Sequence, residues 1–220
     1  MNRLKYYSRY KPKKSLNQLD DVIEKYLDIR GGTYIEVGAN NGVTQSNTYY
    51  LEVCKQWRGL LIEPIDRLYK ECLWNRPNST VIQRALVSDE CESKFVTIHD
   101  SNLMSVVQAG EVLSDTEQEH LARGREVQGL EHSPESQVVA ETLSSVIKRL
   151  GEFEQVDLFS LDVEGFEMEV LKGIDFSKHR PRYILVETAN FTGVDKFLDT
   201  VGYKFIEKCT HHDYLFQDQS

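Results

Sequence analysis

Apolar residues recur along this chain in two alternating patterns, short continuous runs and longer stretches with helical spacing. The short runs predict strands over residues 33–37, 59–63, 80–86, 156–161 and 182–187. Helical spacing predicts helices over residues 66–74, 143–150, 166–173 and 194–201, with a further helix soon after Ser46. Strands that alternate with helices of this length are typical of βαβ units and a parallel sheet.

The pattern is different before the first strand. The first residues, about 1–14, form a basic arm, and apolar residues at helical spacing then predict an amphipathic helix that begins at Ser15 and ends near Gly31. We therefore divide the chain into an N-terminal arm and helix, residues 1–30, and a single domain, residues 31–220.

The second half of the chain has an interruption and a distinct end. After a short strand over residues 94–98, residues 99–137 are polar and weakly periodic, and we interpret them as an insertion with one acidic helix near 111–123. The last two strands, 203–208 and 213–217, are close enough in sequence to pair antiparallel.

Six or seven strands with alternating helices and an antiparallel end hairpin predict a doubly wound α/β sheet with helices on both faces. In such sheets, ligands bind beyond the carboxyl ends of the strands, at the point where the strand order reverses. The residues that follow each predicted strand are therefore the first candidates for a functional site.

Composition narrows the class of ligand and the compartment. The chain has 26 Lys and Arg against 35 Asp and Glu, a net charge of -9, so a nucleic-acid partner is not expected because binding to phosphates requires clustered basic residues. No run approaches the roughly 20 apolar residues that span a bilayer, and the basic arm lacks the apolar core of a signal peptide. We expect a cytoplasmic protein without a membrane partner.

The most informative motif directly follows the first predicted strand. Glu36, Gly38 and Gly42 form an acidic, glycine-containing loop before a helix, and Glu63 ends the next strand. Glycines allow the backbone to turn sharply and to approach a ligand closely. An acidic residue at the end of the second strand accepts hydrogen bonds from ribose hydroxyls in nucleoside sites. This arrangement predicts an adenosine-type ligand.

The loop itself discriminates between adenosine ligands. A dinucleotide fingerprint requires glycines at positions 38, 40 and 43, where this chain has Gly38, Asn40 and Val43. No Gly-Lys-Ser/Thr sequence follows the turn, which excludes a P-loop. The loop fits S-adenosylmethionine, which carries no phosphates, with Glu36 near its cationic amino-acid end.

Three carboxylates follow later strands of the predicted sheet. Asp162 and Glu164 come just after the strand at 156–161, and Glu187 ends the strand at 182–187. Carboxylates that converge at one edge of the sheet repel one another. A raised pKa, a cationic ligand or a divalent metal must therefore reduce this repulsion. Asp162 and Glu187 are accordingly the candidate ligands of a metal ion, with Mg²⁺ as the candidate metal.

Several blocks together resemble the FkbM family of methyltransferases, in order and in spacing. These blocks are YIEVGANNGVTQSNTYYLE, WRGLLIEP, RALVSD, SLDVEGFEMEVLKG and YILVE. The resemblance implies a Rossmann-like class I methyltransferase fold with a mostly parallel seven-stranded sheet. It also implies S-adenosylmethionine as donor and methylation of a hydroxyl on a sugar, glycan or natural product. The insertion at 99–137 matches no pattern of the family, which leaves the acceptor open.

The resemblance also implies roles for individual residues. The glycine-rich loop would line the methionine and ribose, Glu63 would bind the ribose hydroxyls, Ala85 and Leu86 would face the adenine, and Asp162 would touch the amino end or the reaction centre. The donor-binding residues implied in this way are Glu36, Gly38, Ala39, Asn40, Gly42, Ser46, Asn47, Glu63, Pro64, Ala85, Leu86 and Asp162.

Catalysis requires little beyond alignment, because a sulfonium donor already carries an activated methyl group. A hydroxyl acceptor benefits from a general base, for which the candidates are Glu164, Asp162 and His99. We therefore predict an O-methyltransferase that acts on a glycan or another small polyhydroxylated acceptor. The alternatives are a methyltransferase that acts on RNA or protein and a noncatalytic module that binds S-adenosylmethionine. The oligomeric state is open.

Overall fold

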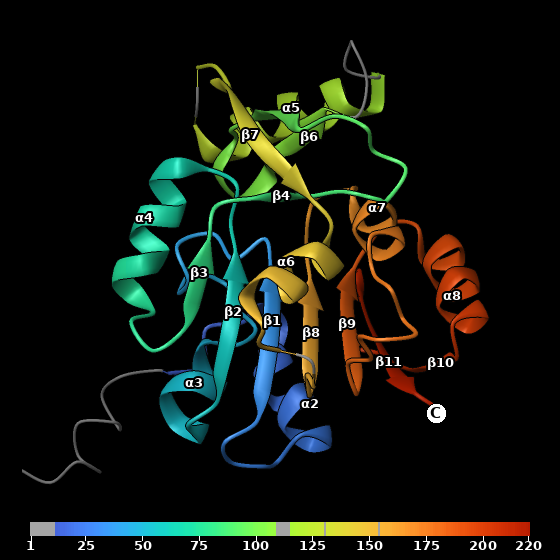
Figure 1. Ribbon diagram of the computed structural model, residues 1–220. Helices are drawn as coiled ribbons and strands as arrows, with labels where there is room; N and C mark the ends of the chain where they lie inside the picture. The colour runs from blue at the N-terminus through green and yellow to red at the C-terminus, as the bar shows by residue number, and fades with distance from the viewer. Residues whose placement is uncertain (1–11, 109–114, 130, 154) are drawn as a thin grey trace, which may run out of the picture.

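The computed structural model describes residues 12–220 except 109–114, 130 and 154 (Figure 1). Its main feature is a seven-stranded sheet with the order β10-β11-β9-β8-β1-β2-β3. The strands of this sheet are β1 (Thr33–Val37), β2 (Arg58–Ile62), β3 (Thr80–Ile82), β8 (Leu158–Leu161), β9 (Tyr183–Glu187), β10 (Tyr203–Lys208) and β11 (Asp213–Asp218).

The sheet is parallel except for one strand. β1 pairs in parallel with β2 on one side and with β8 on the other, so the strand order reverses beside β1. β11 lies between β9 and β10 and is antiparallel to both. The predicted α/β fold with a mostly parallel sheet and an antiparallel C-terminal pair is confirmed. Short turns join β10 to β11 directly, whereas the parallel strands need helical crossovers.

Helices cover both faces of the sheet. They are α2 (Leu19–Tyr26), α3 (Tyr49–Lys55), α4 (Asp66–Asn75), α6 (Leu143–Leu150), α7 (Glu167–Lys172) and α8 (Phe191–Thr200). Alternate residues of β1 point to opposite faces. Ile35 therefore belongs to the core cluster that packs against α6, α7 and α8, and Tyr34 to the cluster that packs against α2 and α3.

The N-terminal helix is shorter than predicted. A 3-10 turn, η1 (Leu16–Gln18), comes first because Asn17 and Gln18 have positive φ angles of 50° and 64°. Ser15 still receives a hydrogen bond from the N–H of Asp20 at 2.7 Å, close to its predicted capping role. The helix ends at Tyr26 and not near Gly31, and Leu27 at its C-cap is buried.

The basic arm falls mostly on residues outside the described part, since residues 1–11 are not described. Of its last residues, Lys13 forms ion pairs with Asp21 and Glu24 of α2, at 2.8 Å to Glu24. This part of the arm is therefore docked on the first helix.

The predicted strand at 80–86 is wrong as a single element. β3 ends at Ile82, and the chain leaves the main sheet before it forms a separate strand, β4 (Ala85–Leu86). β4 pairs in parallel with Ala140 and Glu141 of another strand. Gln83 and Arg84 separate the two apolar ends of this segment, and the two ends pair with different strands.

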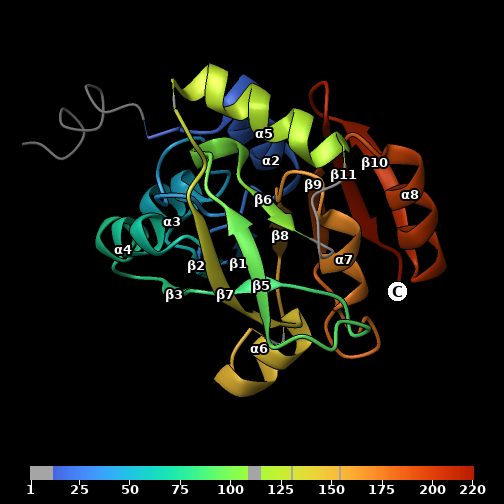
Figure 2. The same ribbon diagram turned by 90° about the horizontal axis from the view of Figure 1, so that it is seen from above.

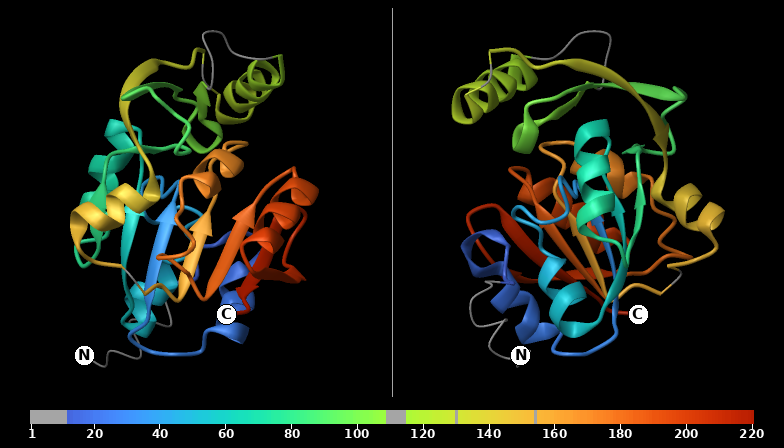
Figure 3. Two further views of the ribbon diagram at one scale, coloured as in Figure 1. Left: turned by 45° about the vertical axis from the view of Figure 1, so that its right-hand side comes forward. Right: turned by 90° about the vertical axis from the view of Figure 1, so that its left-hand side faces the viewer.

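The region interpreted as an irregular insertion connects the strands of a second sheet and contains one of them, β6 (Val106–Gln108), completely. The other strands are β4, β5 (Phe95–His99) and β7 (Glu135–Glu141), and the sheet has the order β4-β7-β5-β6. Figure 2 shows this sheet from above, over the carboxyl ends of the main parallel strands, and Figure 3 shows the two layers from the side. The insertion therefore covers the edge at which the sequence places the functional residues.

One helix, α5 (Asp115–Gln128), lies beside the second sheet. The prediction of a helix at 111–123 holds for its described part, whereas residues 111–114 lie outside the described residues. Leu121 is buried, and a Cβ on Gly124 would lie 3.0 Å from the Cβ of Met104 in the 3-10 turn η2 (Asn102–Met104). Packing on this turn extends α5 beyond its predicted end. None of the described helices is long and apolar enough to cross a membrane.

Candidate functional site

The glycine-rich loop lies tightly between the ends of two strands. Gly38 has a φ of +81°, and a Cβ on it would lie 1.8 Å from the carbonyl oxygen of Asp162. The N–H of Gly38 donates to the carbonyl of Ile62 at 3.1 Å, and that of Asp162 donates to Val37 at 3.1 Å. The loop is thus fixed to β2 on one side and β8 on the other, with glycine required at position 38.

Glu36 is engaged by the start of the following helix. Its carboxylate accepts hydrogen bonds from the hydroxyls of Ser46, at 2.9 Å, and Thr48, and from the N–H of Asn47 at 3.0 Å. Ser46 also accepts a hydrogen bond from the N–H of Tyr49, the first residue of α3, at 3.1 Å. The position of Glu36 at the loop is as expected, and its contact with a donor molecule stays a prediction.

Asn47 presents an unused acceptor at the loop. Its amide nitrogen donates to the hydroxyl of Ser160 at 3.1 Å, whereas its Oδ1 is buried and accepts no hydrogen bond within the part of the chain that the structure describes. A buried acceptor of this kind suits a ligand that carries N–H groups.

Arg76, which no motif in the sequence indicated, anchors the glycine-rich loop through hydrogen bonds. Arg76 follows α4 and is 0% exposed. It donates to Glu52 at 2.7 Å, to the carbonyl of Gly42 at 2.9 Å and to the hydroxyls of Ser46 and Thr48 at 3.2 and 3.0 Å. Its partners are 24 to 34 residues away in sequence, so no local pattern could have marked it as buried.

Glu63 lies against the same loop from the end of β2. It is 4% exposed, its Oε2 accepts from the N–H of Asn40 at 2.8 Å, and its Oε1 accepts from the N–H of Ile65 at 2.9 Å. Burial raises the pKa of Glu63 to about 7, although both hydrogen bonds lower it. Pro64 follows, and its carbonyl accepts a hydrogen bond from Gln83 at 3.1 Å.

Acidic side chains line the neighbouring strand ends. Leu161 pairs with Val186, which places Asp162 beside Glu187, and Glu187 pairs with Asp213 on β11. Burial raises the pKa of Asp162 well above its ordinary value, with further contributions from Glu187 and Glu164. Burial, followed by repulsion from Asp213, also raises the pKa of Glu187. The structure therefore brings the three predicted carboxylates together.

Asp213 joins this group because an antiparallel strand begins at the edge where parallel strands end. That signal was present in the sequence, since Asp213 opens the last predicted strand, but the sequence analysis did not use it. Among the described residues, no group of three or more His, Cys, Asp or Glu side chains is arranged to hold a metal ion. The predicted Mg²⁺ site at Asp162 and Glu187 is therefore not supported.

Glu164 points toward the insertion. It has a φ of +54°, in the left-handed region that non-glycine residues rarely adopt. Its Oε2 lies 3.1 Å from Nε2 of His120 on α5, within ion-pair distance. Glu164 raises the pKa of His120, while burial acts in the opposite direction. The sequence analysis missed His120 because it lies in the weakly patterned insertion.

The model of the methyltransferase FkbM domain matches residues 36–210, from the glycine-rich loop to the turn before β11. The chain belongs to the FkbM methyltransferase family.

A solved structure agrees with the fold. The chain resembles the crystal structure of methyltransferase FkbM from Methylobacillus flagellatus KT, with 13% identity and a TM-score of 0.51, over 85% of this chain and 43% of that one. A TehB-like S-adenosylmethionine-dependent methyltransferase from Corynebacterium glutamicum gives 10% identity and a TM-score of 0.47, over 98% and 97% of the two chains. No curated protein matches. This chain spans less than half of the M. flagellatus protein.

His99 is placed differently from the other candidate bases of this FkbM-family chain. It is 6% exposed and lies on β5 in the second sheet. Its Nε2 is 2.9 Å from Oε1 of Gln108 on β6, and its Nδ1 is 3.6 Å from Glu135 on β7. Because both ring nitrogens face side chains of the second sheet, the geometry gives no support to His99 as a base.

Ala85 and Leu86 need a correction. They were expected at the end of the third strand, facing the adenine, but they form β4 and pair with β7. Both are buried, Ala85 in a cluster with Ile65 and Ile98 and Leu86 in the main core. Their placement at the end of a single strand over 80–86 was wrong, because the chain turns into the second sheet after Ile82.

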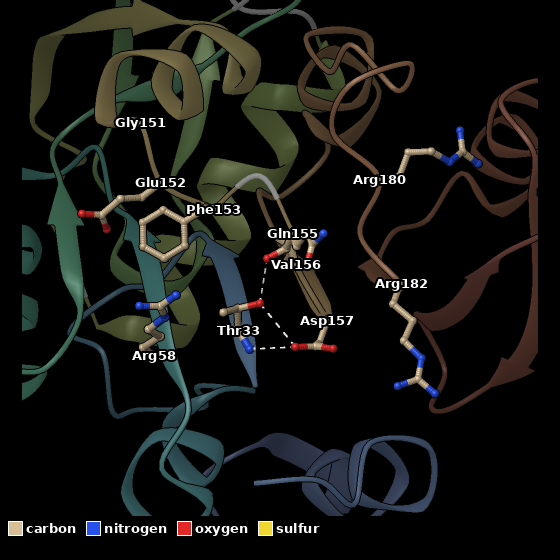
Figure 4. A pocket seen from close by; sticks show the side chains of 10 residues that line it. All are labelled: Thr33, Arg58, Gly151, Glu152, Phe153, Gln155, Val156, Asp157, Arg180 and Arg182. Atoms are coloured by element: carbon tan, nitrogen blue, oxygen red, sulfur yellow. Dashed lines mark hydrogen bonds between the residues drawn. The ribbon is translucent and has the colours of Figure 1, made fainter. Parts of the chain in front are cut away.

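A cavity of about 560 Å³ lies at the opposite edge of the main sheet, where the parallel strands begin (Figure 4). It is lined by Thr33, Arg58, Gly151, Glu152, Phe153, Gln155, Val156, Asp157, Arg180 and Arg182. Thr33 donates to Asp157 at 2.9 Å and to the carbonyl of Gln155 at 2.8 Å on its floor. Doubly wound sheets bind ligands at the carboxyl edge, so this cavity is separate from the candidate site.

Proposed function

We propose that this FkbM-family protein is an S-adenosylmethionine-dependent O-methyltransferase that acts on a hydroxyl of a sugar, glycan or similar polyhydroxylated molecule. The observation that carries the proposal is the position of Glu63, whose carboxylate ends β2 and lies 2.8 Å from the N–H of Asn40 in the glycine-rich loop. A carboxylate at this position is suited to accept hydrogen bonds from the two ribose hydroxyls of the donor.

The charge of the site supports S-adenosylmethionine over phosphate-bearing adenosine ligands. Buried Asp162 and its acidic neighbours would repel phosphates, whereas a sulfonium and an ammonium group would relieve their mutual repulsion. The unpartnered Oδ1 of Asn47 offers an acceptor to such an ammonium group. Asp162, Asn47 and Glu63 are therefore the residues that we expect to hold the two ends of the donor.

S-adenosylmethionine supplies an activated methyl group, so the protein mainly aligns the acceptor oxygen with it. The glycine-rich loop fixes the donor side, because the N–H of Gly38 donates to the carbonyl of Ile62 and the carbonyl of Gly42 accepts from Arg76. The second sheet and α5 cover this edge and are in position to contact the acceptor and to exclude water.

Support for a hydroxyl acceptor comes from the resemblance to FkbM methyltransferases, and the net charge of -9 disfavours RNA. The role of the insertion follows from its place above the site, where it would determine which acceptor fits. The experiments below distinguish this proposal from a methyltransferase that acts on RNA or protein and from a noncatalytic module that binds S-adenosylmethionine.

The test begins with calorimetric titration of S-adenosylmethionine and S-adenosylhomocysteine. We expect binding to the wild type, a loss of about tenfold or more in Glu63→Ala, from the lost hydrogen bonds of a charged group, and no change in Glu71→Ala, an exposed control on α4. Absence of binding, or an unchanged affinity in Glu63→Ala, would overturn the proposal.

The acceptor class is tested with radiolabelled S-adenosylmethionine. Nucleotide-sugars and oligosaccharides are offered in parallel with RNA and with protein, each with Mg²⁺ and with chelator. We expect incorporation into the sugar pools in both conditions. Incorporation into RNA that falls steeply with salt, or into protein, would replace the hydroxyl acceptor. Donor binding without any transfer would identify a noncatalytic module.

A further inference from the structure

We infer that His120 of the insertion helix and Glu164 form a carboxylate–imidazole pair, in which His120 accepts the proton of the acceptor hydroxyl. The inference rests on the proposed function and adds a catalytic residue to it. Neither the motifs of the sequence nor the family resemblance includes His120.

The pair joins two parts of the chain that are far apart in sequence. Glu164 belongs to the loop after β8, beside Asp162, whereas His120 belongs to α5 above the carboxyl edge. The ion pair between Oε2 of Glu164 and Nε2 of His120, at 3.1 Å, holds the imidazole next to this loop. Both side chains are partly buried, with 26% and 29% of their surface exposed, so a substrate can still reach them.

Glu164 does not cap the helix that follows it. The helix that follows, α7, has its start served by Glu167, whose Oε1 accepts from the N–H of Gly165 at 2.7 Å and whose Oε2 accepts from the hydroxyl of Thr188 at 3.2 Å. Glu164 nevertheless keeps a strained left-handed backbone at a φ of +54°. Strain of this kind persists where the surrounding structure imposes it and is concentrated at functional sites.

The contact determines which nitrogen of His120 is basic. A carboxylate next to Nε2 favours the proton on that nitrogen, which leaves the lone pair on Nδ1. The same pairing makes the ring a stronger base. Glu164 raises the pKa of His120 most, Glu167 raises it further, and Arg123 on α5 lowers it.

The proton and electron pairs balance in a single displacement. The acceptor oxygen forms a bond to the methyl carbon while the bond between that carbon and sulfur breaks. The electron pair goes to sulfur, which becomes the neutral thioether of S-adenosylhomocysteine. The hydroxyl proton moves to Nδ1 of His120, and Glu164 stabilises the imidazolium that results.

The first experiment needs no acceptor. Ring ¹⁵N and ¹³C shifts of histidine are followed against pH in the full chain saturated with S-adenosylhomocysteine. We expect His120 to carry its proton on Nε2 in the neutral form, and its pKa to fall in Glu164→Gln. A neutral form with the proton on Nδ1, or an unchanged pKa in Glu164→Gln, would overturn the pair.

The second experiment tests catalysis with the oligosaccharide mixture as acceptor. His120→Ala should lower kcat by about 100-fold or more, as for loss of a general base, with the Kd of S-adenosylmethionine within twofold of wild type. Added imidazole should restore part of the rate, which a structural role would not produce. The control is His132→Ala, an exposed histidine of the same insertion, which should keep the wild-type rate.

An unchanged rate in His120→Ala, or a loss that imidazole does not restore, would overturn the base while leaving the proposed function intact. A wild type that binds no donor or transfers no methyl group would contradict the proposed function, and the inference would fall with it. The two failures are distinguished by the wild-type measurements.

Discussion

The carbonyl oxygen of Asp162 occupies the space in which a side chain at Gly38 would begin. A Cβ at position 38 would lie 1.8 Å from that oxygen, and the φ of Gly38 is +81°. The backbones of the loop after β1 and of the loop after β8 are thus packed closely against each other. We therefore expect a methyl donor that binds on the glycine-rich loop to lie close to Asp162.

Gly38→Ala should therefore destabilise the protein and abolish donor binding. The left-handed backbone costs about 1–2 kcal/mol for a residue with a Cβ, and the clash must be relieved by moving one strand end, at about 1–3 kcal/mol more. Urea denaturation and titration of S-adenosylhomocysteine measure the two effects. Gly31→Ala is the matched control, because Gly31 has a φ of +74° but nothing within 4 Å of its Cβ. Equal losses in the two variants would contradict the role of the clash.

Arg76→Met should destabilise the protein by about 3–5 kcal/mol, because the buried carboxylate of Glu52 would lose its charged partner. The affinity for S-adenosylhomocysteine should fall as well. The carbonyl of Gly42 and the hydroxyl of Ser46 would lose the hydrogen bonds from Arg76 that fix the glycine-rich loop. Chemical denaturation and calorimetry measure both quantities.

Arg58→Met provides the comparison for Arg76→Met. Arg58 is exposed at the cavity of the opposite edge, so its replacement should change stability by less than about 0.5 kcal/mol and leave donor affinity unchanged. A loss of affinity for S-adenosylhomocysteine in Arg58→Met would contradict the prediction, because it would indicate binding at the edge where the parallel strands begin.

Donor affinity should increase with pH across neutrality. The pKa of Glu63 is raised to about 7 by burial, and only its ionised form can accept hydrogen bonds with both oxygens. The Kd of S-adenosylhomocysteine should therefore fall by about tenfold from pH 6 to pH 8. Glu63→Gln should bind more weakly and lose most of this dependence. Calorimetry at several pH values decides, and a full tenfold change retained in Glu63→Gln would exclude Glu63 as its source.

The stability of the donor-free protein should change in the opposite direction. A carboxyl whose pKa is higher in the folded state than in the unfolded state contributes its full stabilisation at a pH below the ordinary pKa, near 4.5 for Glu63. This contribution is lost as the pH rises to the folded-state pKa of about 7. For Glu63 alone the loss is about 3 kcal/mol. Urea midpoints should be lower at pH 7.5 than at pH 5, and Glu63→Gln should reduce the difference. A midpoint that rises over this interval would contradict the prediction.

The secondary structure was predictable where one local pattern determined it. The strand at Thr33–Val37, the strand at Tyr203–Lys208 and the helix at Leu143–Leu150 have the bounds that their sequence indicates. Each consists of a short run rich in apolar residues or of apolar residues at helical spacing, flanked by turn or capping residues such as Thr142, whose side chain caps α6.

The second sheet could not be read in this way. The segment from Thr80 to Leu86 has apolar residues at both ends, yet Ile82 pairs with Ile62 and Leu86 pairs with Glu141. Apolar residues indicate that a strand is buried but not which strand lies beside it. The polar surface of β7, exposed over most of its length, gave no sign of a strand at all.

The sequence by itself determined the order of the elements, the glycine-rich loop and the acidic residues that end the strands at Glu63, Asp162 and Glu187, since each follows from neighbours in the chain. Only the tertiary structure decided that Arg76 holds the loop and that His120 meets Glu164. Ion pairs and burial depend on atoms that are close in space, and these partners are tens of residues apart in the chain. Local spacing therefore carries no signal for them.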